Sequence, residues 1–99
     1  MNKGYWISCY REIYDADKLS AYAALAKPAI ESQGGRFLVR GQAAYASGSG
    51  LIERTVLVEW PSLEKAQVAY KSDDYQKALV ALSDGVDRDF RIVEGAEVG

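Results

Sequence analysis

Histidine is absent from this chain of 99 residues. Serine–histidine and cysteine–histidine catalysis, proximal-histidine haem ligation and nearly all zinc sites depend on that side chain. A metal site would therefore need carboxylates alone, and no group of Asp and Glu has the spacing of a calcium-binding loop. We expect no metal and no cofactor.

Cysteine and long apolar runs are scarce as well. Cys9 is the single cysteine, so no disulfide can form within the chain. No apolar run approaches the roughly 18–20 residues that a membrane span needs. The N-terminal residues also lack the apolar segment of a signal peptide. These absences predict a cytoplasmic protein with no membrane partner.

The chain has no excess of positive charge. Lys and Arg number 12 and Asp and Glu number 14, which gives a net charge of −2. Binding to nucleic acid through phosphate contacts is therefore disfavoured. Apolar residues make up 48% and charged residues 26%, which is typical of a soluble globular protein. The length suits one domain over residues 1–99.

The first third of the chain predicts a strand followed by a helix. Residues 4–12 are rich in aromatic and β-prone side chains and predict a strand. Asp15 is a suitable N-cap for a helix over 16–33, in which apolar residues recur every three or four positions. Gly34-Gly35 ends this helix. Pro28 lies inside it, where its ring clashes with the carbonyl of Ala24, so we expect a bend there.

The rest of the chain predicts three strands and a helical region. The strands are expected at 36–41, 53–60 and 86–94. A flexible connection of small residues, 42–50, separates the first two. Ser62 and Ser72 are N-cap candidates, so the helical region between the last two strands is expected to break near Ser72 and to end at Gly85.

The order of strand, helix, strand, strand, helix, strand predicts an α+β, ferredoxin-like βαββαβ fold. Right-handed crossovers then give a four-stranded antiparallel sheet with the helices on one face. Side chains alternate along the first strand, with Tyr5, Ile7 and Cys9 on one face. Both faces of the sheet are therefore partly apolar. The uncovered face predicts a homodimer in which two sheets pack face to face.

Five segments resemble a known family. They are Lys3-Gly4-Tyr5-Trp6-Ile7, Tyr22 with Pro28-Ala29-Ile30, Gly34-Gly35-Arg36-Phe37-Leu38-Val39-Arg40-Gly41, Glu59-Trp60-Pro61-Ser62, and Tyr70-Lys71-Ser72-Asp73-Asp74-Tyr75-Gln76. Together they are similar to the bacterial family called domain of unknown function 1330, from Lys3 to Glu94. One departure is Gly41-Gln42, where the family often has two glycines.

The resemblance implies a dimeric α/β-barrel fold, shared with antibiotic-biosynthesis monooxygenases. It implies no established activity. The wider fold class includes cofactor-free oxygenases, haem-degrading enzymes, isomerases and decarboxylases, and a transfer of any of these would be an analogy of fold alone. The missing histidine weakens the haem-degrading branch further.

The tyrosines are the first candidates for a binding site. The helical spacing places Tyr22, Tyr70 and Tyr75 on inward faces, where they could line a pocket for a planar or aromatic ligand. The alternative is core packing with satisfied hydroxyls. Cys9 is interpreted as a small buried apolar residue rather than a nucleophile, because no activating base is recognisable.

Two arginines and a tryptophan complete the candidate set. Arg40 ends one strand of the central hairpin and Arg54 begins the other, so the two guanidinium groups could hold a carboxylate or phosphate. The alternative for each is a salt bridge, for example to Glu59. Trp60 could form an aromatic wall of the pocket, and the neighbouring Glu59 could then act as a base or be structural. The predicted ligand-binding residues are Tyr22, Arg40, Trp60, Tyr70 and Tyr75.

Two functions remain open from the sequence. One is a cofactor-free enzyme, monooxygenase- or isomerase-like, that acts on a small aromatic or acidic metabolite. The other is a non-catalytic module that binds a small molecule or serves for dimerisation. No recognisable set of acid, base and nucleophile favours the first over the second.

Overall fold

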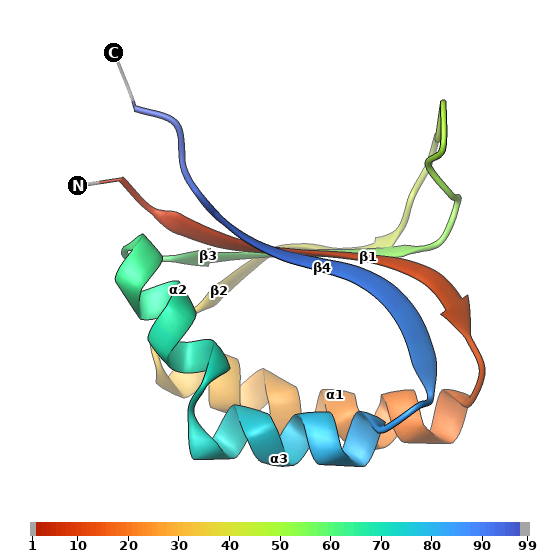
Figure 1. Cartoon of the computed structure of the whole chain (residues 1–99), viewed down its shortest axis with the longest axis horizontal. Helices are drawn as coiled ribbons and strands as arrows, with labels where there is room; N and C mark the ends of the chain where they lie inside the picture. The colour runs from red at the N-terminus through yellow and green to blue at the C-terminus, as the bar shows by residue number, and fades with distance from the viewer. Residues whose placement is uncertain (1, 98–99) are drawn as a thin grey trace.

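The computed structural model describes residues 2–97 and contains four strands and three helices (Figure 1). In chain order these are β1 (Gly4–Ile13), α1 (Ala16–Ser32), β2 (Arg36–Gln42), β3 (Arg54–Trp60), α2 (Leu63–Tyr70), α3 (Asp73–Leu82) and β4 (Val86–Glu94). Every element expected from the sequence is present. The ends differ from the expected ones by a few residues at most.

The strands form one antiparallel sheet in the order β2-β3-β1-β4. The three helices lie on one side of it, with α1 and α3 next to each other (Figure 1). The ferredoxin-like prediction is therefore confirmed. Within the described residues, no helix is long and apolar enough to cross a membrane.

Side-chain hydroxyls and carboxylates start the helices, as expected. Asp15 accepts hydrogen bonds from the backbone N–H groups of Asp17 and Lys18, at 3.0 and 3.1 Å. Ser62 caps α2 and Ser72 caps α3, so the helical region breaks at the second of these caps. Pro28 lies within α1, which continues past it to Ser32.

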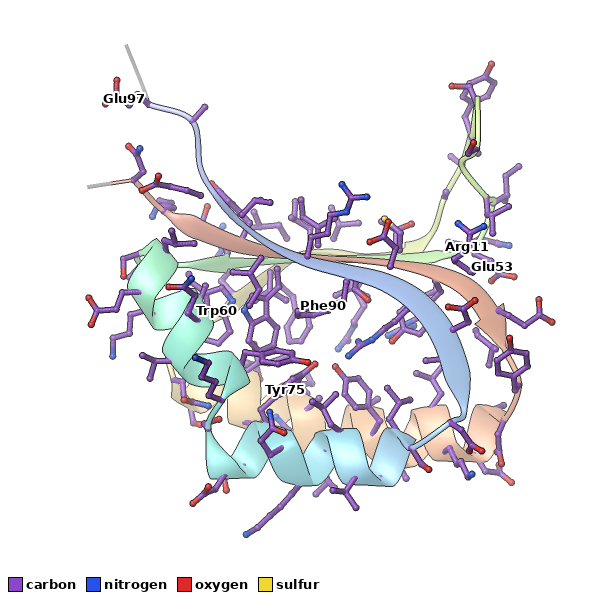
Figure 2. All side chains as sticks on the ribbon, in the orientation of Figure 1. Arg11, Glu53, Trp60, Tyr75, Phe90 and Glu97 are labelled. Carbon is purple, nitrogen blue, oxygen red and sulfur yellow. The ribbon has the colours of Figure 1, made fainter. Side chains whose placement is uncertain are left out.

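Aromatic rings dominate the core between the sheet and the helices (Figure 2). The ring centroid of Trp6 lies 4.8 Å from that of Trp60 and 4.7 Å from that of Tyr75. The Trp6 indole N–H donates to the carbonyl of Ala66 at 2.9 Å, which ties β1 to α2. Trp60 and Tyr75 are fully buried, so large apolar areas leave water here and stabilise the packing of helices on sheet.

The face of the sheet opposite the helices is uncovered in the chain. Register places Ile7 beside Leu57, and Leu57 beside Val39, so apolar side chains cross the three strands in one row. Cys9 is on the same face and is exposed. The prediction that Cys9 is buried is therefore wrong, because strand alternation directs it away from the helices. The connection between β2 and β3 also rises on this side (Figure 1).

Candidate functional site

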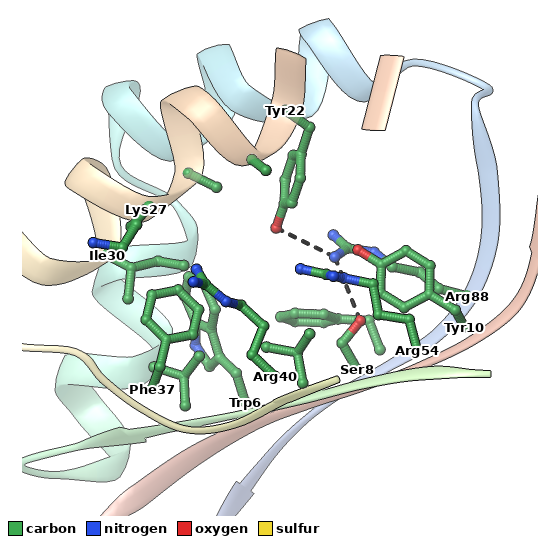
Figure 3. A pocket seen from close by; sticks show the side chains of 15 residues that line it. Trp6, Ser8, Tyr10, Tyr22, Lys27, Ile30, Phe37, Arg40, Arg54 and Arg88 are labelled. Atoms are coloured by element: carbon green, nitrogen blue, oxygen red, sulfur yellow. Dashed lines mark hydrogen bonds between the residues drawn. The ribbon is translucent and has the colours of Figure 1, made fainter. Parts of the chain in front are cut away.

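A pocket lies between α1 and the helix-facing side of the sheet (Figure 3). About 450 Å³ in it is not filled by protein atoms, and part of that space is open to solvent. The part of this space in which the centre of a water-sized sphere fits without touching protein atoms is much smaller, about 40 Å³. Aromatic and aliphatic side chains make up most of the wall. The pocket therefore has room for a few water molecules, and its wall is suited to a planar apolar group.

Three arginines, each from a different strand, line this pocket: Arg40 from β2, Arg54 from β3 and Arg88 from β4. The sheet register explains why they share a face. Arg40 is opposite Val56, which is two residues from Arg54 and so points the same way. Arg88 is opposite Tyr10, another pocket residue. Strand alternation thus brings three positive charges to one side of the sheet.

No carboxylate neutralises these guanidinium groups in the described part of the chain. The ion pairs found there use Lys3, Lys18, Lys27 and Arg91. No Asp or Glu is among the residues that line the pocket. The site is therefore strongly positive, although the whole chain has a net charge of −2.

Aromatic rings hold the guanidinium groups in place instead. The Arg40 Cζ atom lies 5.0 Å from the centroid of the Phe37 ring. The Cζ atoms of Arg54 and Arg88 each lie 5.9 Å from the centroid of the Tyr10 ring. Such cation–π contacts orient an arginine but leave its N–H groups free to bind an anion.

Arg54 carries the clearest unmet hydrogen-bonding need. Its Nε atom is fully buried and has no hydrogen-bond partner among the described residues. Leaving a buried donor without an acceptor costs about 1–3 kcal/mol, and more for a charged group. Among the described residues, one other buried side-chain nitrogen has no hydrogen-bond partner. It is Trp60 Nε1, and Trp60 does not line the pocket. An anionic oxygen would satisfy the Arg54 donor after the side chains that cover this atom move aside, because a fully buried atom offers a ligand no contact surface.

Arg88 belongs to a hydrogen-bonded network. Its Nη1 atom donates to Ser8 Oγ at 3.4 Å and to the Tyr22 hydroxyl at 3.3 Å, and its Nη2 atom donates to the Tyr75 hydroxyl at 3.1 Å. The two tyrosine oxygens are 2.7 Å apart. Burial raises the pKa of the Tyr75 hydroxyl well above its usual value, although Arg88 works against this rise. Tyr75 therefore stays protonated at neutral pH.

The structure brings only part of the predicted set into the pocket lining. Tyr22 and Arg40 line it, and Tyr75 reaches it through its hydrogen bonds to Tyr22 and Arg88. Trp60 packs on Trp6 in the core. Tyr70 packs on Phe90, with ring centroids 5.2 Å apart. Neither of these two is among the lining residues, and the ligand-binding roles of all five stay predictions.

Among residues 2–97, neither Arg40 nor Arg54 forms a salt bridge. Glu59 lies on the uncovered face, where it pairs with Lys3 at 3.7 Å and accepts a hydrogen bond from the Tyr5 hydroxyl at 3.4 Å. That location also removes Glu59 as a base for the pocket, because the sheet separates the two.

Arg88 and Tyr10 are two of the polar pocket residues that sequence reasoning missed. Both lie in phase with aromatic residues of the same strand: Arg88 is two positions before Phe90, and Tyr10 is four positions after Trp6. The period of two was the available signal. Charged residues on a strand usually face solvent, so beyond this period nothing in the local sequence marks Arg88 as a pocket residue.

Fold and site together define a class: a small ferredoxin-like α+β protein with a positive pocket between its helices and its sheet. Within that class the chain belongs to the family described as domain of unknown function (DUF1330), whose model matches residues 3–96. The family resemblance noted in the sequence is thus confirmed. A search of curated proteins finds no match.

Solved structures with low sequence identity share the fold. A protein of unknown function from Rhodopseudomonas palustris has a TM-score of 0.76 at 15% identity, over 98% of this chain and 85% of that one. SnoaB, a cofactor-independent oxygenase from Streptomyces nogalater, has a TM-score of 0.65 at 12% identity, over 99% and 97%. A dimeric ferredoxin-like protein of unknown function from Thermobifida fusca has a TM-score of 0.63 at 12% identity, over 94% and 91%.

Proposed function

We propose that this chain binds a small planar organic anion, a carboxylate on an aromatic or similarly flat skeleton, in the pocket between α1 and the sheet. One observation carries the proposal. Three arginines face the pocket with no carboxylate beside them, and the buried Nε of Arg54 has no partner among the described residues. A carboxylate supplies the acceptor and the charge that this arrangement lacks.

Each part of the pocket has a role in this proposal. Arg54 anchors the carboxylate, because its Nε is buried and its guanidinium is oriented by the Tyr10 ring. Arg40 is exposed and lies at the edge strand β2, where it can close over a bound ligand. The flat skeleton packs between Ile30 of α1 and Phe37 of β2.

Binding requires the pocket to widen. The present pocket suits water rather than a benzoate-sized molecule, because the volume open to the centre of a water-sized sphere is about 40 Å³, whereas drug-sized ligand pockets run to roughly 300–1,000 Å³. Arg40 is exposed and Phe37 is half-buried on an edge strand, so these two side chains can move with little loss of core packing. The ligand enters between α1 and β2 in this scheme.

Isothermal titration calorimetry with benzoate and its uncharged analogue benzamide tests the proposal. Benzoate is expected to bind and benzamide to bind much more weakly. Arg54→Met, which keeps an apolar stem, is expected to weaken benzoate binding about tenfold to 100-fold, since hydrogen bonds to charged groups contribute about 1.5–3 kcal/mol. Lys77→Met removes the same charge from the exposed surface of α3 and should leave affinity unchanged. Equal, weak heats for both compounds would argue against the site.

A second candidate function is turnover of the bound anion by cofactor-free chemistry, monooxygenase- or isomerase-like. It is supported by the activity of SnoaB, a cofactor-independent oxygenase, and by another neighbour described as an antibiotic biosynthesis monooxygenase, and so by fold analogy alone. The non-catalytic binding module is the alternative. Oxygen consumption on addition of a ligand that calorimetry has identified separates the two.

The homodimer is also part of the proposal. Val39 of the apolar row is 44% accessible in a single chain, and Val93, which lies on the same face opposite Tyr5, is 37% accessible. The T. fusca neighbour is described as dimeric. A second copy packed on this face would cover these side chains and support the sheet from behind the pocket. A cytoplasmic location likewise remains a prediction from composition.

A further inference from the structure

The protons in the Arg88 network can be assigned by counting donors and acceptors. Arginine has only N–H donors, so the hydroxyl oxygens of Tyr22 and Tyr75 each accept from Arg88. Each tyrosine has one further proton to place. The two oxygens are 2.7 Å apart, so one hydroxyl donates to the other.

Access to the pocket decides the direction of that hydrogen bond, because Tyr22 and Tyr75 are both buried but only Tyr22 is among the residues that line the pocket. Tyr75 is fully buried, and among residues 2–97 its hydroxyl has no hydrogen-bond partner besides Tyr22 and Arg88. If Tyr22 were the donor, the Tyr75 proton would be buried without an acceptor, at a cost of about 1–3 kcal/mol. Tyr75 therefore donates to Tyr22.

The consequence is a free donor at the pocket. Tyr22 accepts from both Arg88 and Tyr75, and its own proton has no acceptor among the described residues. Tyr22 lines the pocket, and Figure 3 shows its hydroxyl pointing from α1 toward the sheet. Two incoming hydrogen bonds, one from a cation, polarise the Tyr22 O–H group and make it a stronger donor.

We propose that the Tyr22 hydroxyl is a preorganised donor for a ligand oxyanion, so that the pocket prefers planar carboxylates that also carry a phenolate or enolate oxygen. This inference rests on the proposed function, in which Arg54 holds the carboxylate. Fixed donors aimed at a negative oxygen need no reorganisation when the charge forms. When a neutral phenol binds as its phenolate, the phenolic proton is released to solvent.

The probe for this proposal is 4-hydroxy-3-nitrobenzoate, a planar carboxylate whose phenol changes absorbance when it ionises near neutral pH. The protein has no histidine, the side chain whose ordinary pKa lies between pH 5 and 8. The titratable groups that share the pocket with the Tyr22 hydroxyl are Tyr10, Arg40, Arg54 and Arg88 of the sheet and Lys27 of α1, and Tyr75 of α3 is hydrogen-bonded to it. An absorbance titration in that range therefore reports the ligand.

The expected result is a phenol pKa about one unit lower in the complex than in free solution, equivalent to about tenfold tighter binding of the phenolate. Tyr22→Phe is expected to lose most of this shift. Tyr75→Phe removes one of the two hydrogen bonds to the Tyr22 oxygen and should keep part of it. Tyr14→Phe, which removes an exposed hydroxyl, should keep all of it.

3-Nitrobenzoate, which lacks the hydroxyl, separates the possible failures. It is expected to bind wild type and Tyr22→Phe equally, which also shows that the variant pocket is folded. If the nitrophenol binds but its pKa shift is absent, or equal in wild type and Tyr22→Phe, the oxyanion inference is overturned and the carboxylate site stands. If neither compound binds wild type, both proposals are overturned.

Discussion

Single residues decide how closely the layers approach, and Gly35 is the clearest case. The helix end at Gly34-Gly35 was expected, and Gly34 has a φ of 98°, the left-handed conformation that glycine tolerates. Gly35 serves a second purpose that the sequence did not reveal. A Cβ atom there would lie 2.5 Å from Ile30 Cγ2 and 2.8 Å from the Trp60 ring. Both neighbours are buried, so neither has room to move.

Gly35→Ala is expected to destabilise the fold by about 1–3 kcal/mol, because overpacking forces side chains off their rotamers and shifts the backbone. Gly41→Ala is the matched control, since nothing lies within 4 Å of a Cβ atom at that position. It should change stability by no more than about 0.5 kcal/mol. Urea unfolding followed by tryptophan fluorescence measures both. Similar midpoints for the two variants would contradict this account of Gly35.

At the scale of elements, local signals located the helices and strands well. Caps at Asp15, Ser62 and Ser72 and the alternation in the strands are short-range features, and they predicted the right elements. The composition of the pocket was harder to predict. Periodicity shows that Trp60 and Tyr70 face inward, but it does not show whether an inward ring fills the core or borders a cavity. That distinction depends on the exact stacking of the layers.

Strand pairing across the chain sets the rest of the site. Arg88 enters the pocket because β4 pairs with β1 so that Arg88 lies opposite Tyr10. This pairing joins residues almost eighty positions apart, and nothing local in the sequence fixes it. The pair of Arg40 and Arg54 was easier to foresee, because both belong to one hairpin.

The connection 43–53 is an element whose contribution can be tested. Two backbone hydrogen bonds begin in it: Ala43 donates to Glu53, and Gly50 donates to Ser47. Tyr45 is 82% exposed. Replacing residues 44–52 with an Asn-Gly turn keeps Ala43 opposite Glu53 and should therefore leave the circular dichroism spectrum of the chain nearly unchanged. If the shortened chain unfolds, the connection stabilises the fold in a way that these contacts do not explain.

At the scale of the whole molecule, the uncovered face of the sheet is the surface on which the predicted homodimer depends. Leu57→Lys places a charge at the centre of the apolar row, next to Ile7 and Val39. We expect wild type to run as a dimer and this variant as a monomer in size-exclusion chromatography with light scattering. Val80→Lys is the control, because Val80 is 79% exposed on α3, away from that face. A wild-type monomer at micromolar concentration would exclude the homodimer.

The charge inventory of the chain predicts its response to pH. Hydrogen bonds from Lys18 and Arg91 lower the pKa of Asp84 and Asp89 respectively. A carboxylate whose folded-state pKa is lowered adds stability above its unfolded value of about 4, and that stability is lost as pH falls through the folded-state pKa. With no histidine, the melting temperature should be flat from pH 6 to 8 and should fall below about pH 4. A step near neutral pH would contradict this.

The central claim is that a carboxylate occupies the pocket and satisfies Arg54. A crystal structure with 4-iodobenzoate tests it most directly, because the anomalous signal of iodine locates the ligand independently of the protein density. The account predicts an iodine peak between α1 and the sheet, with a carboxylate oxygen within hydrogen-bonding distance of Arg54 Nε. A pocket with no iodine peak, or a ligand found only on the uncovered face, would contradict it.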